Sequence, residues 1–262
     1  MKKNFMFFVA AIFALFLCFS IILLPATAYQ ADCDQTGTMT ILFLGSAYST
    51  GNLPDGAEAI YVVKADFDRA VVNLSTLSRD LAVDAKILED PAITSAPLVE
   101  IFNAAYQKAS GSNTEKRAYA SKILNEVVNS QLGIKTDHYL TLDWDQVTGM
   151  VDTIGGVEIN IPSGFISDRN VQFNAGAQKL NGALAAEFVR TYEPGGESAR
   201  YQRQKLFIQA LQAQILNNKD LVSQLPTLLN QFRAAIVTDL TDDQLSSLIC
   251  LVSSLPQGAI IF

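Results

Sequence analysis

The stretch "HYLTLDWDQVTGMVDTIGGVEINIP", residues 138–162, decides the fold class because its hydrophobic pattern changes twice within one short segment. "HYLTLDW" is typical of a strand, "WDQVTGMVDTIG" of an amphipathic helix closed by glycines, and "VEINIP" of a second strand. Strands interleaved with helices in this way are the units of layered α/β domains.

The flanking segments extend this pattern in both directions. Before it, "TMTILFLGS", "AIYVVKAD" and "RAVVNLSTL" are typical of strands, and the first is apolar enough to lie buried between layers. Residues 97–109 and 115–132 have the apolar spacing of amphipathic helices, and the chain after Leu180 is mostly helical in pattern. We therefore predict an α/β domain over residues 38–262, with a central mixed β-sheet flanked by helices, after a polar linker at residues 29–37.

The N-terminus predicts a membrane segment. Lys2 and Lys3 precede a run without charge from Asn4 to Ala28, which is about long enough to span a bilayer. We expect residues 1–28 to be a signal anchor in the cell membrane that holds the domain outside the cytoplasm. The "ATA" at residues 26–28 also resembles a cleavage site, so secretion after cleavage is the alternative.

Charge and rare residues exclude some classes of function. A formal charge of −7 and a pI near 4.7 oppose non-specific binding to nucleic acid, so we expect no nucleic-acid partner. His138 is the only histidine, which excludes a His-rich metal site. Cys33 and Cys250 would meet oxidising conditions outside the cytoplasm, where they either pair or remain separate thiols.

The segment "VRTYEPGGESARYQRQ", residues 189–204, concentrates three arginines around a Gly-Gly turn. With Ser198 as the N-cap, one face of the following helix carries Arg200, Arg203, Gln204, Phe207 and Leu211. An inward guanidinium needs an anion, and the start of a helix favours a phosphate there. Alternatively, the arginines pair with nearby acids in the sequence: Glu187, Glu193 and Glu197.

A distant arginine supports an anion site. Arg79 and Asp80 directly follow the apolar segment "VVNLSTL", at the kind of strand end where open α/β sheets place their ligands. A plain surface ion pair is the alternative, but the position favours a site.

In their order and spacing, these segments resemble the LytR-CpsA-Psr proteins of Gram-positive cell envelopes. The likeness runs from about Thr38 to Asn217, and its pieces are the following: a strand ending in Gly45, "SRD" at 78–80, "FNAAY" at 102–106, the stretch 132–162, "FNAGAQKLNGALAAEFVRT" at 173–191, and Arg200, Arg203 and Gln204.

The resemblance implies an extracytoplasmic phosphotransferase that attaches a polyprenyl-pyrophosphate-linked glycan to peptidoglycan, assisted by Mg²⁺ or Mn²⁺. It implies that Arg79, Arg190 and Arg200 are catalytic. It assigns the pyrophosphate to Arg79, Asp80, Arg190, Arg200, Arg203 and Gln204, and the metal to Glu58. Candidate walls of a cleft for the lipid are Ile101, Phe102, Phe188, Phe207 and Leu211, although ordinary core packing is the favoured alternative for each of them taken singly.

This chain departs from the family pattern at several of these positions. Ala47 stands where the family has a metal-binding Asp, Gly56 and Tyr192 stand where it has arginines, and Glu58 and Glu197 stand where it has Asp. Asp55 lies one residue from the expected arginine and is a candidate to reach the metal. A catalytically impaired module that binds polyprenyl phosphate or glycan phosphate is therefore the alternative function.

Overall fold

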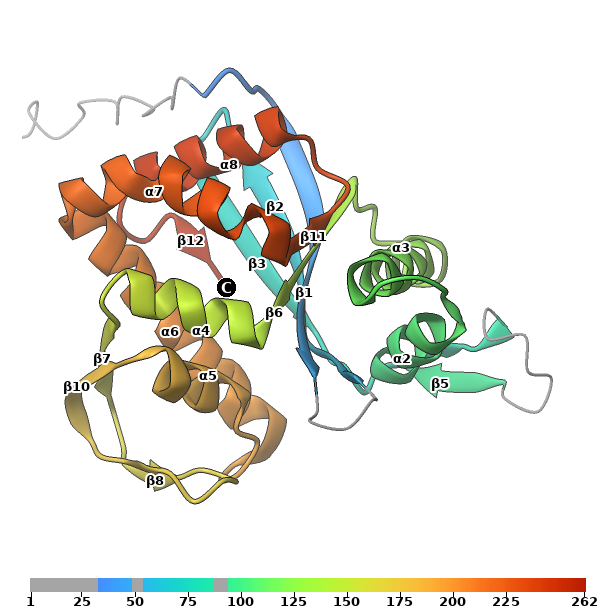
Figure 1. The fold of residues 1–262 in the computed structure, drawn as a ribbon, viewed down its shortest axis with the longest axis horizontal. Helices are drawn as coiled ribbons and strands as arrows, with labels where there is room; N and C mark the ends of the chain where they lie inside the picture. Colours follow the sequence, from blue (N-terminus) through green and yellow to red (C-terminus); the bar gives the residue numbers. More distant parts are fainter. Residues whose placement is uncertain (1–32, 49–53, 87–93) are drawn as a thin grey trace, which may run out of the picture. The chain divides into compact units, whose positions relative to one another are not determined.

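A computed structural model describes residues 33–48, 54–86 and 94–262, in which helices cover both faces of a six-stranded sheet (Figure 1). The predicted membrane segment, residues 1–28, lies outside the described residues. Within the described ranges, no helix has the length and apolar character needed to cross a bilayer.

The central sheet has the strand order β11-β6-β1-β2-β3-β12. Its strands are β1 (Thr38–Tyr48), β2 (Pro54–Asp66), β3 (Val71–Leu77), β6 (His138–Asp143), β11 (Ile236–Thr238) and β12 (Ile260–Ile261). The pairs β1–β6 and β3–β12 are parallel, and the other neighbours are antiparallel. The predicted mixed sheet is therefore confirmed, although the sequence patterns did not indicate the short edge strands β11 and β12.

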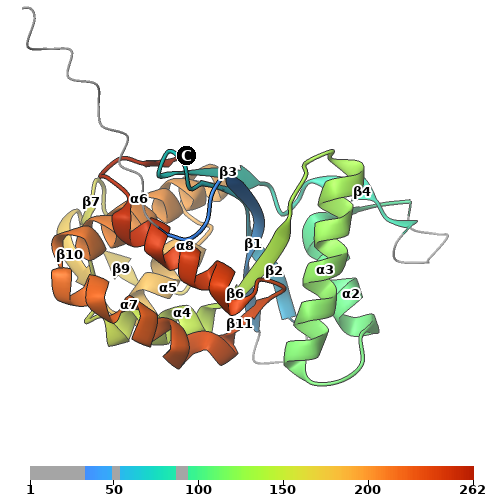
Figure 2. The ribbon, with the colours of Figure 1, turned by 90° about the horizontal axis from the view of Figure 1, so that it is seen from above.

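The helices divide between the two faces of the sheet. Their bounds are α2 (Leu98–Lys108), α3 (Asn113–Gln131), α4 (Trp144–Thr153), α5 (Gly182–Arg190), α6 (Gly196–Asn217), α7 (Lys219–Phe232) and α8 (Asp242–Ser254), with a 3-10 turn η2 (Arg233–Ala235). Figure 2 shows α2 and α3 on one side of the sheet and the later helices on the other. The predicted flanking helices are thus confirmed on both faces.

The core under α2 and α3 corrects part of the predicted lipid cleft. Ile101 and Phe102 are fully buried there, against Leu42, Leu44 and Ile60 of the sheet. They pack as ordinary core residues, because α2 turns its apolar face onto the sheet. For these two residues the cleft role is therefore wrong, and the alternative of ordinary core packing is correct.

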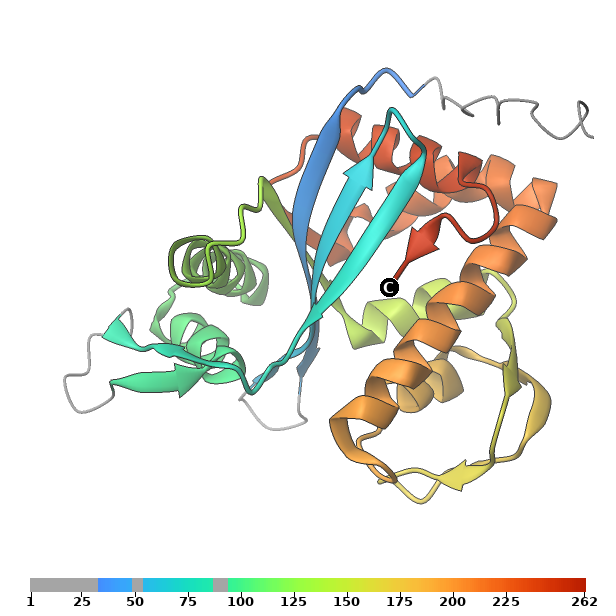
Figure 3. The same ribbon diagram turned by 180° about the vertical axis from the view of Figure 1, so that it is seen from behind.

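Three small two-stranded sheets complete the fold. They pair β4 (Ala82–Asp84) with β5 (Ser95–Pro97), β7 (Val157–Ile161) with β10 (Gly176–Leu180), and β8 (Phe165–Ile166) with β9 (Gln172–Phe173). The strand predicted from "VEINIP" therefore forms as β7, but it lies outside the central sheet. Seen from behind, α6 begins beside β8 and runs past the β2–β3 hairpin (Figure 3).

Cys33 and Cys250 form a disulfide with an S–S distance of 2.06 Å. This bond joins the segment before β1 to α8 across 217 residues of sequence, and both cysteines contact the apolar cluster beneath α8. Of the two possibilities that the sequence left open, a disulfide or two separate thiols, the structure has the disulfide.

Removing this disulfide should lower the stability of the domain. Because a crosslink across a long loop restricts the unfolded chain, the double variant Cys33→Ser, Cys250→Ser should lose about 2–4 kcal/mol of unfolding free energy in a denaturant titration. A reductant should destabilise the native protein by the same amount and leave the double variant unchanged. A native protein that is indifferent to the reductant would contradict the pairing.

Candidate functional site

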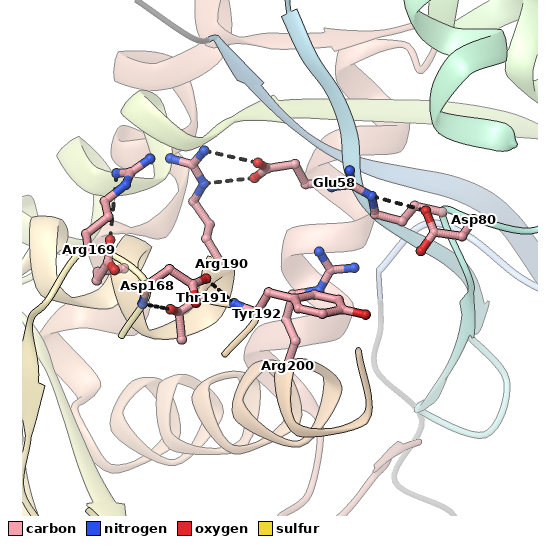
Figure 4. Close-up of a pocket in the computed structure, with 10 residues that line it drawn as sticks. Glu58, Asp80, Asp168, Arg169, Arg190, Thr191, Tyr192 and Arg200 are labelled. Atoms are coloured by element: carbon pink, nitrogen blue, oxygen red, sulfur yellow. Dashed lines mark hydrogen bonds and ion pairs between the residues drawn. The ribbon is translucent and has the colours of Figure 1, made fainter. Parts of the chain in front are cut away.

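Four arginines and four carboxylates line one pocket of about 350 Å³, which we call the polar pocket (Figure 4). Its lining is Glu58, Arg79, Asp80, Asp168, Arg169, Glu187, Arg190, Thr191, Tyr192 and Arg200. The structure thus brings together five of the seven residues predicted as site residues from sequence. The catalytic and binding roles assigned to them remain predictions.

A β-bulge in β2 positions Glu58. Gly45 pairs with Ala59 and Ser46 pairs with Ala57, so the residue between them has no partner in β1. A bulge lets two successive side chains leave the strict alternation of a strand. Glu58 is the extra residue of this bulge. Its side chain lines the polar pocket, and the next residue, Ala59, lines a separate, apolar space.

Arg190, the last residue of α5, forms a two-point ion pair with Glu58 across the polar pocket. Its Nε donates to Oε2 at 2.8 Å and its Nη2 donates to Oε1 at 3.1 Å. The two side chains are only 17% and 14% exposed, so the pair is shielded from most solvent. This geometry is the strongest form of an arginine–carboxylate contact. Arg190 therefore pairs with a residue 132 positions away in the sequence.

Arg200 lies almost completely buried at the start of α6. It is 3% exposed, and its Nη2 donates to Oε1 of Glu197 at 2.7 Å. Arg200 therefore pairs with a glutamate that is close by in the sequence, which was the alternative to an anion site. Its Nε nevertheless has no hydrogen-bond partner within the described part of the chain. A buried donor without a partner is unfavourable, so an anion that reached it would gain a hydrogen bond from this Nε.

The predicted cap of this helix is wrong. The N-cap of α6 is Gly195 rather than Ser198, which lies within the first turn. Gly195 has a φ of 98°, a left-handed conformation that glycine adopts without strain. The Gly-Gly turn thus starts the helix earlier than the capping pattern indicates.

Arg203 and Gln204 lie outside the lining of the polar pocket. The Arg203 guanidinium donates to the carbonyl oxygens of Thr191 and Pro194, and burial lowers its pKa. Gln204 donates to the carbonyl of Val189 at 3.1 Å and accepts a hydrogen bond from Tyr61. Both side chains therefore fasten the α5–α6 connection to the body of the domain, and their predicted contact with substrate stays untested.

A second space of about 350 Å³, which we call the apolar cavity, opens between α4, α6 and α7. Its walls include Trp144 and Val147 of α4, Phe207 and Leu211 of α6, and Leu228 and Phe232 of α7. Two of the predicted wall residues, Phe207 and Leu211, are therefore confirmed as lining residues. Phe188 instead packs against Phe165 and Phe173 in the core.

The polar pocket and the apolar cavity share one dividing wall. Val189 lines the cavity while Arg190 lines the pocket, and the same holds for Ala59 and Glu58. The hydrogen-bonded pair of Tyr61 and Gln204 lines the cavity on this side. A polar and an apolar space therefore lie next to each other in this part of the fold.

Comparison with known proteins decides the family. The model of the LytR_cpsA_psr family matches residues 25–259. The chain belongs to the LytR-CpsA-Psr family.

Two curated relatives from this family illustrate its range. Regulatory protein MsrR of Staphylococcus aureus is 24% identical over 220 residues, which are 82% of this chain and 60% of the relative. The polyisoprenyl-teichoic acid–peptidoglycan teichoic acid transferase TagV of Bacillus subtilis is 28% identical over 181 residues, which are 66% of this chain and 42% of TagV. The chain thus spans about half the length of these relatives.

Solved structures of LytR-CpsA-Psr proteins share the fold. The crystal structure of Bacillus subtilis TagV aligns with a TM-score of 0.66 at 22% identity, covering 87% of this chain and 84% of that one. TagT bound to LIIa-WTA aligns with a TM-score of 0.60 at 16% identity, covering 86% and 77% of the two chains. At these identities the likeness shows the fold alone.

The described carboxylates of this LytR-CpsA-Psr chain do not form a ready metal site. No group of three His, Cys, Asp or Glu side chains within the described ranges is arranged to hold an ion. Both oxygens of Glu58 accept hydrogen bonds from Arg190. A metal at Glu58 would have to share this carboxylate with Arg190, and the role of Glu58 as a metal ligand stays a prediction. The side chains of Ala47 and Asp55 lie outside those that the structure describes.

The Arg190–Glu58 pair should be coupled energetically, because both side chains are shielded and joined at two points. A double-mutant cycle with Glu58→Gln and Arg190→Gln should give a coupling energy of about 1–3 kcal/mol in denaturant unfolding. The more exposed pair Arg233–Asp242, whose side chains are 38% and 83% exposed, is the control and should give less than about 1 kcal/mol. Equal coupling in both cycles would contradict the described geometry.

Proposed function

We propose that this chain is a membrane-anchored phosphotransferase that moves a glycan phosphate from a polyprenyl pyrophosphate carrier onto peptidoglycan. The juxtaposition of an arginine-lined pocket and an apolar cavity carries this proposal, since such a carrier combines a diphosphate with a long apolar chain. Two relatives support it: the name of TagV describes a transfer of this kind, and TagT has been solved bound to LIIa-WTA.

Arg79, Arg190 and Arg200 would hold the pyrophosphate. Arginine forks match phosphate oxygens two at a time, and phosphoryl transfer mainly requires fixed positive charge around the reacting phosphate. Arg200 offers its unpartnered Nε, and Arg79, paired with Asp80 at 3.7 Å, offers its remaining donors. Arg190 must share its guanidinium between the phosphate and Glu58.

In the proposed reaction a peptidoglycan hydroxyl attacks the phosphorus that bears the glycan. The new P–O bond forms as the bond to the bridging oxygen breaks, polyprenyl phosphate leaves, and the hydroxyl proton passes to the leaving phosphate or to water. Localisation at the outer face of the cell membrane follows from the N-terminal segment and stays a proposal. The acidic surface supports a partner other than nucleic acid. Assistance by Mg²⁺ or Mn²⁺ is a separate proposal, which assays with and without these ions test.

A second candidate is a module that binds polyprenyl phosphate or glycan phosphate without turning it over. The observation that favours it is the engagement of Glu58 by Arg190, together with the absence of the family's usual residues at Ala47, Gly56 and Tyr192. Such a module would retain the affinity for the lipid and lack the release of phosphate.

Arg200→Gln should abolish most of the proposed activity. Loss of one charged donor to a reacting oxyanion lowers turnover by roughly 100- to 1000-fold, so release of phosphate from a prenyl pyrophosphate should fall by about that factor. Arg69→Gln, which removes an exposed arginine in the turn after β2, outside the pocket lining, is the control and should retain the native rate.

The unaltered protein decides between the two candidate functions. Release of phosphate in the presence of magnesium or manganese supports the transferase. Tight binding of the lipid without any release, with or without these ions, would instead favour the binding module.

The apolar cavity should contribute affinity only for ligands with a prenyl chain. Leu228→Glu places a carboxylate in the cavity wall and should weaken prenyl pyrophosphate binding by at least about tenfold, because a charge must then be desolvated. Thr227→Glu, on the exposed side of the same helix, is the matched control. Inorganic pyrophosphate should bind all three proteins alike; a loss of its binding in Leu228→Glu would show damage to the fold instead.

A further inference from the structure

We infer that Tyr192 is the platform of a sugar subsite in the polar pocket, which receives the first sugar attached to the pyrophosphate. This inference rests on the proposed function and adds to it a residue that determines which head group is accepted. It starts from an aromatic ring left accessible among charged side chains.

Tyr192 is unusual among the aromatic side chains of the described ranges. Its side chain is 44% exposed, and of the large apolar side chains that are exposed in these ranges, it alone lines the polar pocket. Figure 4 shows its ring next to the Arg200 side chain. An exposed ring usually belongs to a flexible surface side chain, but this one is held in place.

Three contacts hold the Tyr192 segment. The Asp168 carboxylate accepts the backbone N–H of Tyr192 at 2.6 Å and that of Glu193 at 2.8 Å. Partial burial raises the pKa of Asp168, but these hydrogen bonds outweigh that effect. The pKa of the carboxyl group is therefore lowered, and the group stays ionised. A Cβ built on Gly196 would lie 3.7 Å from the ring, so the glycine backbone lies close against the ring.

The Arg200 guanidinium lies 5.9 Å from the centroid of the Tyr192 ring. This cation–π distance ties the ring to the arginine proposed to hold phosphate. A sugar joined directly to that phosphate would therefore come within reach of the ring.

The surrounding groups match the chemistry of a pyranose. A sugar ring presents an apolar C–H face, which packs on an aromatic ring, and a rim of hydroxyls, which bind planar carboxylate and guanidinium groups. Asp80 and Arg169 line the same pocket, and their side chains, which are 60% and 65% exposed, can reach such hydroxyls. Because the pocket holds as many carboxylates as guanidiniums, part of it suits a neutral polyhydroxyl ligand better than a second polyanion.

The test compares three probes in detergent solution: a prenyl pyrophosphate, the same lipid carrying N-acetylglucosamine, and the same lipid carrying glucose. The native protein should bind at least one sugar-bearing probe about tenfold more tightly than the sugar-free probe, the gain expected of one aromatic stacking contact. Tyr192→Ala should reduce this ratio to about one. Tyr192→Phe should keep most of it, since the ring remains.

Tyr119→Ala is the control, because Tyr119 is similarly exposed, at 40%, but lies on α3 outside the pocket. Its ratio should equal that of the native protein. The inference is overturned if the native protein binds all three probes equally, or if Tyr192→Ala keeps the native ratio. Both results leave the proposed function intact as long as the sugar-free probe binds. Failure of all three probes to bind would contradict the proposed function and this inference together.

Discussion

The burial of three polar side chains on one face of α6 is the constraint on which the site depends. Arg200, Arg203 and Gln204 are each at most 8% exposed, and a buried guanidinium or amide is tolerated only when it finds partners. Arg203 donates to carbonyl oxygens of the α5–α6 connection. Gln204 donates to the carbonyl of Val189 and accepts a hydrogen bond from Tyr61. These bonds fix the end of α5 against β2, and the polar pocket forms where the two meet.

This arrangement places two different environments next to each other. On one side, arginines and carboxylates balance each other around the polar pocket; on the other, the apolar cavity lies between helices. Burial raises the pKa of the Tyr61 phenol, so this dividing residue stays neutral. A ligand that enters the polar pocket must compete with Glu58 for Arg190, which favours ligands carrying more negative charge than one carboxylate.

Much of the fold was predictable from the sequence, because long apolar segments keep their periodicity in the structure. The strands β10, β11 and β12 were not, since strands of a few residues are set by their neighbours. The convergence of Arg79, Arg190 and Arg200 followed from their positions after a strand and around a helix start. The contribution of Asp168 and Arg169 was missed, because "SDRN" marks only a turn. The Arg190–Glu58 pair depends on a bulge that the sequence pattern does not indicate. The N-cap of α6 is a glycine in the left-handed conformation, which the capping pattern around Ser198 does not predict.

The most direct test of the central claim is a crystal structure of this chain with a prenyl pyrophosphate bound. The account predicts phosphates within hydrogen-bonding distance of Arg79, Arg190 and Arg200, with the prenyl chain passing Tyr61 and Gln204 into the cavity between α4, α6 and α7. Phosphates bound elsewhere, or a prenyl chain that leaves the cavity empty, would contradict it.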